Sequence, residues 1–162
     1  ALPAGAAVLY RNYESPNRAG EARALKSLCR RHGLLLIVAE DPWLAHQVEA
    51  DGLHLSDRTA RRSGHRRAAK MHPGRLLTIA AHSPAGLRRA AALGADAAFL
   101  SPVFETRSHP GNAGLGVQKF TAWGRRAPLP VYALGGINAG NARALDNSGA
   151  AGIAGIGGWE QP

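Results

Sequence analysis

The sequence predicts an α/β fold with a parallel sheet, because short apolar runs alternate with segments of helical periodicity along all 162 residues. Two of these runs, residues 34–39 and 76–81, are continuously apolar, as expected for strands covered on both faces. Twenty glycines fit many tight turns between strands and helices. We therefore expect a single domain over residues 1–162, without hairpins.

Each element has its own sequence signal. Apolar runs predict strands at residues 5–11, 34–39, 51–55, 76–81, 95–100, 131–134 and 149–156. Polar starts, helical spacing and glycine stops predict helices after residues 15–17, at 43–49, along the basic segment from residue 58 to 70, at 83–92 and at 117–126. A further helix is expected after the glycine turn at residues 135–136.

Two features indicate a phosphate site. Residues 131–138 and 149–158 are strand-to-turn units whose paired glycines, Gly135 with Gly136 and Gly157 with Gly158, expose backbone N–H groups. Bare amides at the start of a helix favour an anion. The segment 101–116 is the longest irregular stretch, and connections longer than about 12 residues are usually functional.

The net charge of +9 is unevenly distributed. Residues 58–95 carry nine Lys and Arg and no acid, whereas the rest of the chain balances at eleven of each sign. No aromatic residue interleaves the arginines to stack on bases, so we interpret the segment as a solvated basic helix face and do not expect nucleic acid as a partner. Attraction of anionic ligands is the alternative.

The remaining composition points to a cytoplasmic setting. The chain has one cysteine, Cys29, which has no partner for an internal disulfide. No apolar run approaches the roughly 18 residues of a membrane span. The apolar start of the chain lacks a basic flank and leads directly into a strand, so we do not interpret it as a signal peptide.

Four segments resemble the thiamine phosphate synthase and TenI-like family: residues 50–55, 101–106, 130–138 and 149–154, in this order and spacing. The resemblance implies a (β/α)8 TIM barrel with sites at the carboxyl ends of its strands. Aligned in this way, the first strand here matches the family's second. The first βα unit and most of the last helix are therefore missing, and we expect a homo-oligomer or rearranged termini to cover the open edge.

In this family a hydroxymethylpyrimidine diphosphate, bound with Mg²⁺, is coupled to a thiazole phosphate with release of diphosphate. The resemblance therefore implies a transferase of thiamine biosynthesis, phosphorylated pyrimidine and thiazole partners, and Mg²⁺ as cofactor. Arg11 falls on the arginine of the diphosphate motif, whose lysine is Tyr13 here. Glu40, Asp41 and Asp57 fall at or beside the metal carboxylates.

The thiazole-phosphate half matches the family more closely. Thr106 and Ser108 supply hydroxyls, and the four glycines of the two turns supply amides, although Gly157 replaces a serine. His109 stands in place of the motif's lysine. With Arg11 and His82, it completes the set of catalytic candidates.

Two alternatives stay open. One is a catalytically inactive member that only binds a phosphorylated ligand. The other is a TenI-type thiazole tautomerase, in which His82 or His109 would replace the histidine whose position Pro102 fills. We expect His54 to be structural and Trp43 and Trp123 to be packing residues.

Overall fold

The computed structural model describes residues 2–62, 74–106, 111 and 113–156. The chain divides into two compact units, residues 1–78 and 79–162. Its described residues form seven strands, and hydrogen-bonded neighbours in the sheet follow chain order from β1 to β7. Parallel pairing with helices between successive strands confirms the predicted α/β class.

The first unit alternates strand and helix. Its elements are β1 (Ala7–Tyr10), α1 (Arg18–Arg31), β2 (Leu35–Ala39), α2 (Pro42–Gln47), β3 (Gly52–Leu55) and α3 (Asp57–Ala60). The parallel register places Tyr10 opposite Val38 and Ala39 opposite His54. The residues that follow β1 and β2 are therefore neighbours of the last residues of β3.

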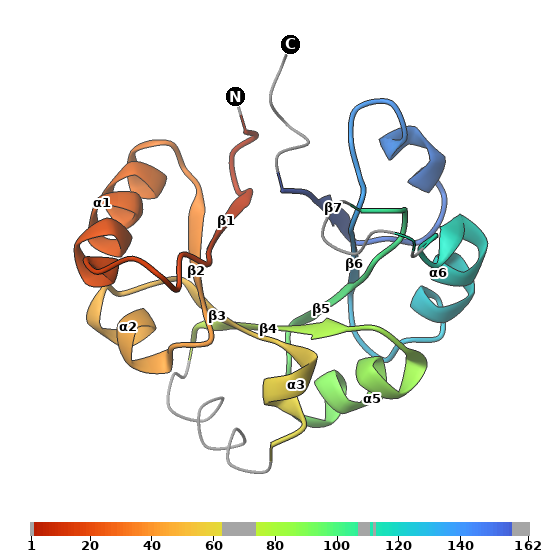
Figure 1. The fold of residues 1–162 in the computed structure, drawn as a ribbon, viewed down its shortest axis with the longest axis horizontal. Coiled ribbons are helices and arrows are strands. Elements are labelled where there is room, and N and C mark those ends of the chain that lie inside the picture. Colours follow the sequence, from red (N-terminus) through yellow and green to blue (C-terminus); the bar gives the residue numbers. More distant parts are fainter. Residues whose placement is uncertain (1, 63–73, 107–110, 112, 157–162) are drawn as a thin grey trace. The chain divides into compact units, whose positions relative to one another are not determined.

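Strand β2 is buried along almost its whole length. Leu36, Val38 and Ala39 are fully buried, and Ile37 is 4% exposed, as the continuous apolar run predicts. Helices α1 and α2 both pack against β2 (Figure 1). Each Å² of apolar surface that this packing removes from water stabilises the folded unit by about 25 cal/mol.

Short polar side chains begin its helices. The Asn17 Oδ1 atom accepts a hydrogen bond from Gly20 N, Asp41 accepts one from Leu44 N, and the Ser56 hydroxyl accepts one from Thr59 N. Each bond satisfies an amide that the first helical turn leaves without a partner, which is worth about 1 kcal/mol. The polar helix starts expected before the helices of residues 18–31 and 42–47 are thus confirmed.

Strand β4 (Leu76–Ala81) begins in the first unit and ends in the second. The other elements of the second unit are α5 (Pro84–Ala92), β5 (Ala97–Leu100), α6 (Gly116–Gly124), β6 (Val131–Leu134), the 3-10 helix η2 (Ala142–Leu145) and β7 (Gly152–Ala154). Strands β5, β6 and β7 pair in parallel, with Leu100 opposite Ala133 and Leu134 opposite Ala154.

Two expectations need correction. The helix predicted after Gly136 is only the four-residue 3-10 helix η2, whose N-cap Asn141 makes no side-chain cap. The Asn141 side chain instead bonds Asn138 N and Gly136 O, and such local bonds compete with helical ones. Trp43 is not a packing residue, because it is 73% exposed.

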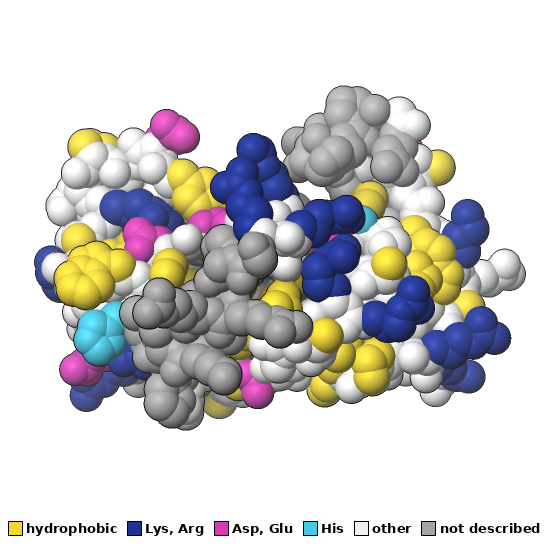
Figure 2. Space-filling model, turned by 90° about the horizontal axis from the view of Figure 1, so that it is seen from below, with side chains coloured by type: hydrophobic (Ala, Val, Ile, Leu, Met, Phe, Trp, Pro, Cys, Tyr) yellow, Lys and Arg dark blue, Asp and Glu magenta, His cyan; other side chains and the backbone are white. Residues whose placement is uncertain are grey.

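Much of the predicted basic helix lies outside the described residues. Its first part is α3, and Arg58, Arg61 and Arg62 are exposed. On the face in Figure 2, Lys and Arg side chains stand at several places with hydrophobic side chains between them. None of the described helices is long and apolar enough to cross a membrane.

Candidate functional site

In the first unit, candidate residues gather where β1, β2 and β3 end. Arg11 directly follows β1 and is exposed, Glu40 directly follows β2, and His54 is the penultimate residue of β3. The charges of Glu40 and Arg11 both act on the imidazole of His54. Carboxyl ends of parallel strands are where α/β proteins hold ligands.

His54 is a buried, neutral histidine. Its Nδ1 atom lies 2.9 Å from the Thr78 hydroxyl, and 8% of the residue is exposed. Burial lowers its pKa to about 4, Glu40 opposes this shift and Arg11 adds to it. A group with this pKa does not exchange protons near neutral pH, which agrees with the structural role expected for it.

Glu40 joins the end of β2 to the start of α3. Its carboxylate accepts hydrogen bonds from Ser56 N and from the Thr59 hydroxyl, both at 2.5 Å. Burial alone would raise the pKa of Glu40, but the bonds from Thr59 and Ser56 outweigh it and lower the pKa. The backbone of Glu40 has φ of 64°, uncommon for a residue with a side chain.

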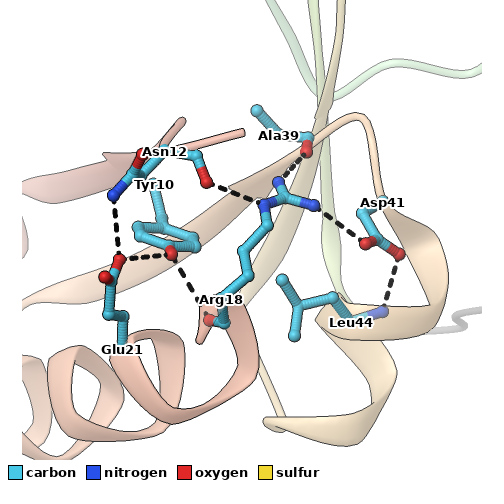
Figure 3. Close-up of polar contacts among 7 residues, drawn as sticks. All are labelled: Tyr10, Asn12, Arg18, Glu21, Ala39, Asp41 and Leu44. Carbon is cyan, nitrogen blue, oxygen red and sulfur yellow. Dashed lines mark hydrogen bonds and ion pairs between the residues drawn. The ribbon is translucent and has the colours of Figure 1, made fainter. Parts of the chain in front are cut away.

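Asp41 is committed to two partners within the first unit (Figure 3). Its Oδ1 atom accepts the hydrogen bond from Leu44 N at 2.8 Å, and its Oδ2 atom accepts one from Arg18 Nη1 at 2.9 Å. Asp57, the third predicted metal carboxylate, is bound by Arg61, whose Nε and Nη2 lie 3.0 and 2.7 Å from Asp57 Oδ2.

In the second unit, the predicted phosphate residues Thr106 and Gly135 are neighbours. A Cβ atom placed on Gly135 would lie 3.4 Å from the Thr106 methyl group. The Oγ1 atom of Thr106 is buried and has no hydrogen-bond partner among the described residues. A buried hydroxyl without a partner costs folding free energy. The Thr106 hydroxyl is therefore suited to donate a hydrogen bond to an acceptor atom of a ligand.

The glycine pair has a structural explanation of its own. Gly135 and Gly136 have φ of 98° and 68°, and a Cβ atom on Gly135 would lie 2.7 Å from Pro102 Cα. A Cβ atom on Gly136 would lie 2.8 Å from Phe104 Cβ and would also meet the Glu105 carbonyl oxygen. The turn therefore needs glycine to pack against residues 102–105, whether or not an anion binds.

His82 follows β4 and is exposed. Its Nδ1 atom donates a hydrogen bond to the Ser101 carbonyl oxygen at 2.8 Å, and the Ser101 hydroxyl lies 3.4 Å from the same nitrogen. This contact holds the imidazole beside the peptide that precedes Pro102. The remaining site candidates, Ser108, His109, Gly157 and Gly158, lie outside the described residues.

Comparison with known proteins gives this arrangement its context. The family model described as thiamine monophosphate synthase matches residues 1–158.

The chain belongs to the thiamine monophosphate synthase family.

Relatives in this family are similar over most of the chain. A thiamine-phosphate synthase of Chloroflexus aurantiacus is 34% identical, covering 95% of this chain and 72% of its own length. A thiamine-phosphate synthase of Prochlorococcus marinus is 38% identical over 93% of this chain, but the chain spans only 42% of that protein. A solved thiamine phosphate pyrophosphorylase from Pyrococcus furiosus superposes with a TM-score of 0.79 at 26% identity, covering 93% of this chain and 71% of that one.

The predicted Mg²⁺ ligands do not fit a metal site. Glu40 and Asp41 each use both carboxylate oxygens on protein donors, and Asp57 is paired with Arg61. In the part of the chain that the structure describes, no three His, Cys, Asp or Glu residues form a group able to hold a metal ion. A hard cation requires several oxygen ligands at once, and these oxygens point to other partners.

Sequence reasoning missed the polar cluster next to Arg11 in this family member. Arg18, Glu21 and Tyr10 link the β1–α1 connection to α1 and to the end of β2 (Figure 3). The available signal was the polar connection between a strand and a helix, a common location for functional residues.

Proposed function

We propose that this chain is a thiamine phosphate synthase, coupling a hydroxymethylpyrimidine diphosphate to a thiazole phosphate. The proposal rests on family membership over residues 1–158. In the reaction, the thiazole nitrogen uses its electron pair to form a C–N bond. Diphosphate leaves with the electrons of the broken C–O bond, so the protein must hold two anionic groups in line.

One structural observation favours a phosphate ligand in the second unit. The buried Thr106 hydroxyl has no partner among the described residues and lies against the Gly135 turn. We infer that it donates to the thiazole phosphate, together with Ser108 and the amides of Gly135, Gly136, Gly157 and Gly158. A phosphate oxygen in this position would satisfy a hydroxyl that has no partner among the described residues.

In the first unit we assign diphosphate binding to Arg11. Its guanidinium is exposed at the end of β1, and an arginine fork matches phosphate oxygens in pairs. Because Glu40, Asp41 and Asp57 are engaged with protein partners, no step of the reaction is assigned to a metal held by these three residues.

The test is turnover. The chain is incubated with both substrates and Mg²⁺, and thiamine phosphate is measured by chromatography. The variant Arg11→Met and the control Arg23→Met, on the exposed part of α1, are assayed in the same way. We expect product from the wild type and from Arg23→Met, and about tenfold or more loss of kcat/KM for Arg11→Met. Product formed no faster than in the absence of protein refutes the synthase proposal.

A specific contact favours one alternative activity. His82 is hydrogen-bonded to the carbonyl of Ser101. The next residue, Pro102, fills the position at which the resemblance places the tautomerase histidine. If the chain is a thiazole tautomerase, it catalyses solvent proton exchange into the thiazole carboxylate phosphate, and His82→Asn abolishes that exchange. Thiazole phosphate binding without turnover of either kind identifies the inactive binding member.

We further infer that residues 1–162 form one domain and contain seven of the eight strands of a (β/α)8 barrel. The likeness to the Pyrococcus furiosus structure supports this reading. We also propose that the chain forms a homo-oligomer, because an open sheet edge favours association. A cytoplasmic location is proposed as well. Sedimentation of the purified chain at the monomer mass contradicts the oligomer.

A further inference from the structure

Arg11 lies between residues that are fixed by α1. The Tyr10 hydroxyl donates to Glu21 Oε2 at 2.8 Å, and Asn12 Nδ2 donates to the same oxygen at 3.0 Å. The Ser15 hydroxyl donates to the other oxygen of Glu21 at 2.6 Å. The residues on both sides of Arg11 are thus tied to one carboxylate in the first turn of α1 (Figure 3).

The guanidinium of Arg18 joins this connection to the end of β2. Its Nε donates to the Asn12 carbonyl at 3.0 Å, its Nη2 to the Ala39 carbonyl at 3.1 Å, and its Nη1 to Asp41 at 2.9 Å. Figure 3 shows the three acceptors arranged around the planar group. They come from three places in the chain, and a rigid fork of donors holds them in one geometry.

Two aromatic rings complete the setting of Arg18. Its guanidinium carbon lies 5.7 Å from the centroid of Tyr10 and 5.2 Å from that of Tyr13, within the range of cation–π attraction. Tyr13 occupies the position of the family's lysine, so the side chain there contacts a cation instead of carrying one. The side chain of Arg18 is only 19% exposed.

We propose that Arg18 is a positioning residue for anion binding by Arg11. It fixes the backbone immediately after Arg11 against the end of β2, so that the Arg11 guanidinium is held where a diphosphate binds. This inference rests on the proposed function, because it assumes that Arg11 binds diphosphate. Arg18 acts through Arg11, since its own nitrogens are directed at Asn12, Ala39 and Asp41.

The alternative is a simple charge effect. If Arg18 only raised the local potential, its removal would weaken diphosphate binding whether or not Arg11 is present. If it positions Arg11, its removal matters only while Arg11 is there to be misplaced. A double-mutant cycle separates these two cases, because it measures the coupling between the residues.

The experiment titrates inorganic diphosphate by calorimetry into the wild type, Arg18→Met, Arg11→Met and the double variant, with Arg23→Met as the control on α1. We expect Arg18→Met and Arg11→Met each to weaken binding on the order of tenfold, and the double variant to bind about as weakly as Arg11→Met. Arg18→Lys keeps the charge but loses the fork, so we expect an intermediate affinity.

The outcomes are distinct. Wild-type binding with additive losses overturns the positioning role and leaves the proposed function standing, and so does an unchanged affinity of Arg18→Met. A wild type that does not bind diphosphate overturns the diphosphate role of Arg11 and the positioning role of Arg18 with it, whereas the synthase proposal is decided by turnover. Thermal unfolding of each variant identifies misfolding. If Arg18→Met does not fold, the cycle is run with Arg18→Lys, where wild-type affinity overturns the proposal.

Discussion

The Nδ1 atom of His54 lies 2.9 Å from the Oγ1 atom of Thr78, and both residues are buried. Removal of water from the ring disfavours its charged form and lowers the pKa of His54 from 6.5 to about 4. Glu40 pulls the pKa up and Arg11 pushes it down. In the folded chain the imidazole of His54, on β3 beside Thr78 of β4, therefore stays neutral throughout the physiological pH range.

This histidine predicts a loss of stability in mild acid. Below pH 6.5 the unfolded chain binds a proton that the folded chain does not bind until about pH 4, so the free energy of unfolding falls as the pH falls through this window. We expect His54 to account for about 2 kcal/mol between pH 7 and pH 5. Urea unfolding at both pH values measures it. His54→Asn should remove this part of the pH dependence, whereas exposed His32→Asn should keep it.

Glu40 gives a second pH-dependent prediction. Hydrogen bonds from Thr59 and Ser56 outweigh burial and lower the pKa of Glu40 below 4.5. The ionised carboxylate therefore contributes fully to the free energy of unfolding above pH 4.5, and this contribution is lost as the pH falls through the lowered pKa. Thr59→Val should destabilise the chain by about 1–2 kcal/mol at pH 7, and less in acid. Thr59→Ser keeps the hydroxyl and serves as the control. Equal unfolding free energies for Thr59→Val and wild type at pH 7 would show that the bond contributes nothing.

The carboxylates show what the sequence could and could not predict. The start of α2 after a polar residue could be predicted, because a helix cap such as Asp41 depends on residues three positions apart. Its other partner, Arg18, is 23 residues away, and Thr59 is 19 residues from Glu40. Spacing along the chain does not reveal which cation or hydroxyl reaches a carboxylate in space, so acids expected to bind Mg²⁺ turned out to have protein partners.

The same distinction applies to the glycine turn. The apolar run of residues 131–134 correctly predicted β6, because a buried strand has a strong local signal. The approach of residues 102–105 to Gly135 and Gly136 is a tertiary contact without a local signal. The sequence therefore indicated a phosphate site followed by a helix. In the structure η2 is a single short 3-10 turn, and packing alone already requires both glycines.

The hydrogen bonds and ion pairs of Glu40, Asp41 and Asp57 predict a weak affinity of the chain for Mg²⁺ in the absence of substrates. Calorimetric titration of the chain with Mg²⁺ should show no saturable binding below millimolar concentration, because Glu40, Asp41 and Asp57 would have to give up protein partners to become ligands. Asp41→Asn and Asp57→Asn should leave that titration unchanged. Stoichiometric micromolar binding that either variant abolishes would contradict this reading of the first unit.

The packing of Gly136 predicts a large cost for a single methyl group. Gly136→Ala should destabilise the chain by more than about 2 kcal/mol, because the left-handed backbone costs about 1–2 kcal/mol and the new Cβ also meets Phe104. Gly94→Ala is the matched control, with φ of 78° and no described atom within 4 Å of its Cβ. We expect about 1 kcal/mol there, measured by urea unfolding. Similar costs at the two positions would exclude the packing explanation.

The hydroxyl of Thr106 separates a ligand role from a folding role. Since its buried Oγ1 has no partner among the described residues, Thr106→Val should change the free energy of unfolding by less than about 0.5 kcal/mol. The same substitution removes a donor to the bound phosphate, so the affinity for thiazole phosphate should fall about tenfold in calorimetry. Thr78→Val is the opposite control: it takes a partner from buried His54 and should cost stability without changing that affinity. Loss of stability with unchanged affinity in Thr106→Val would mean that the hydroxyl serves the fold, and that the phosphate is held by other groups.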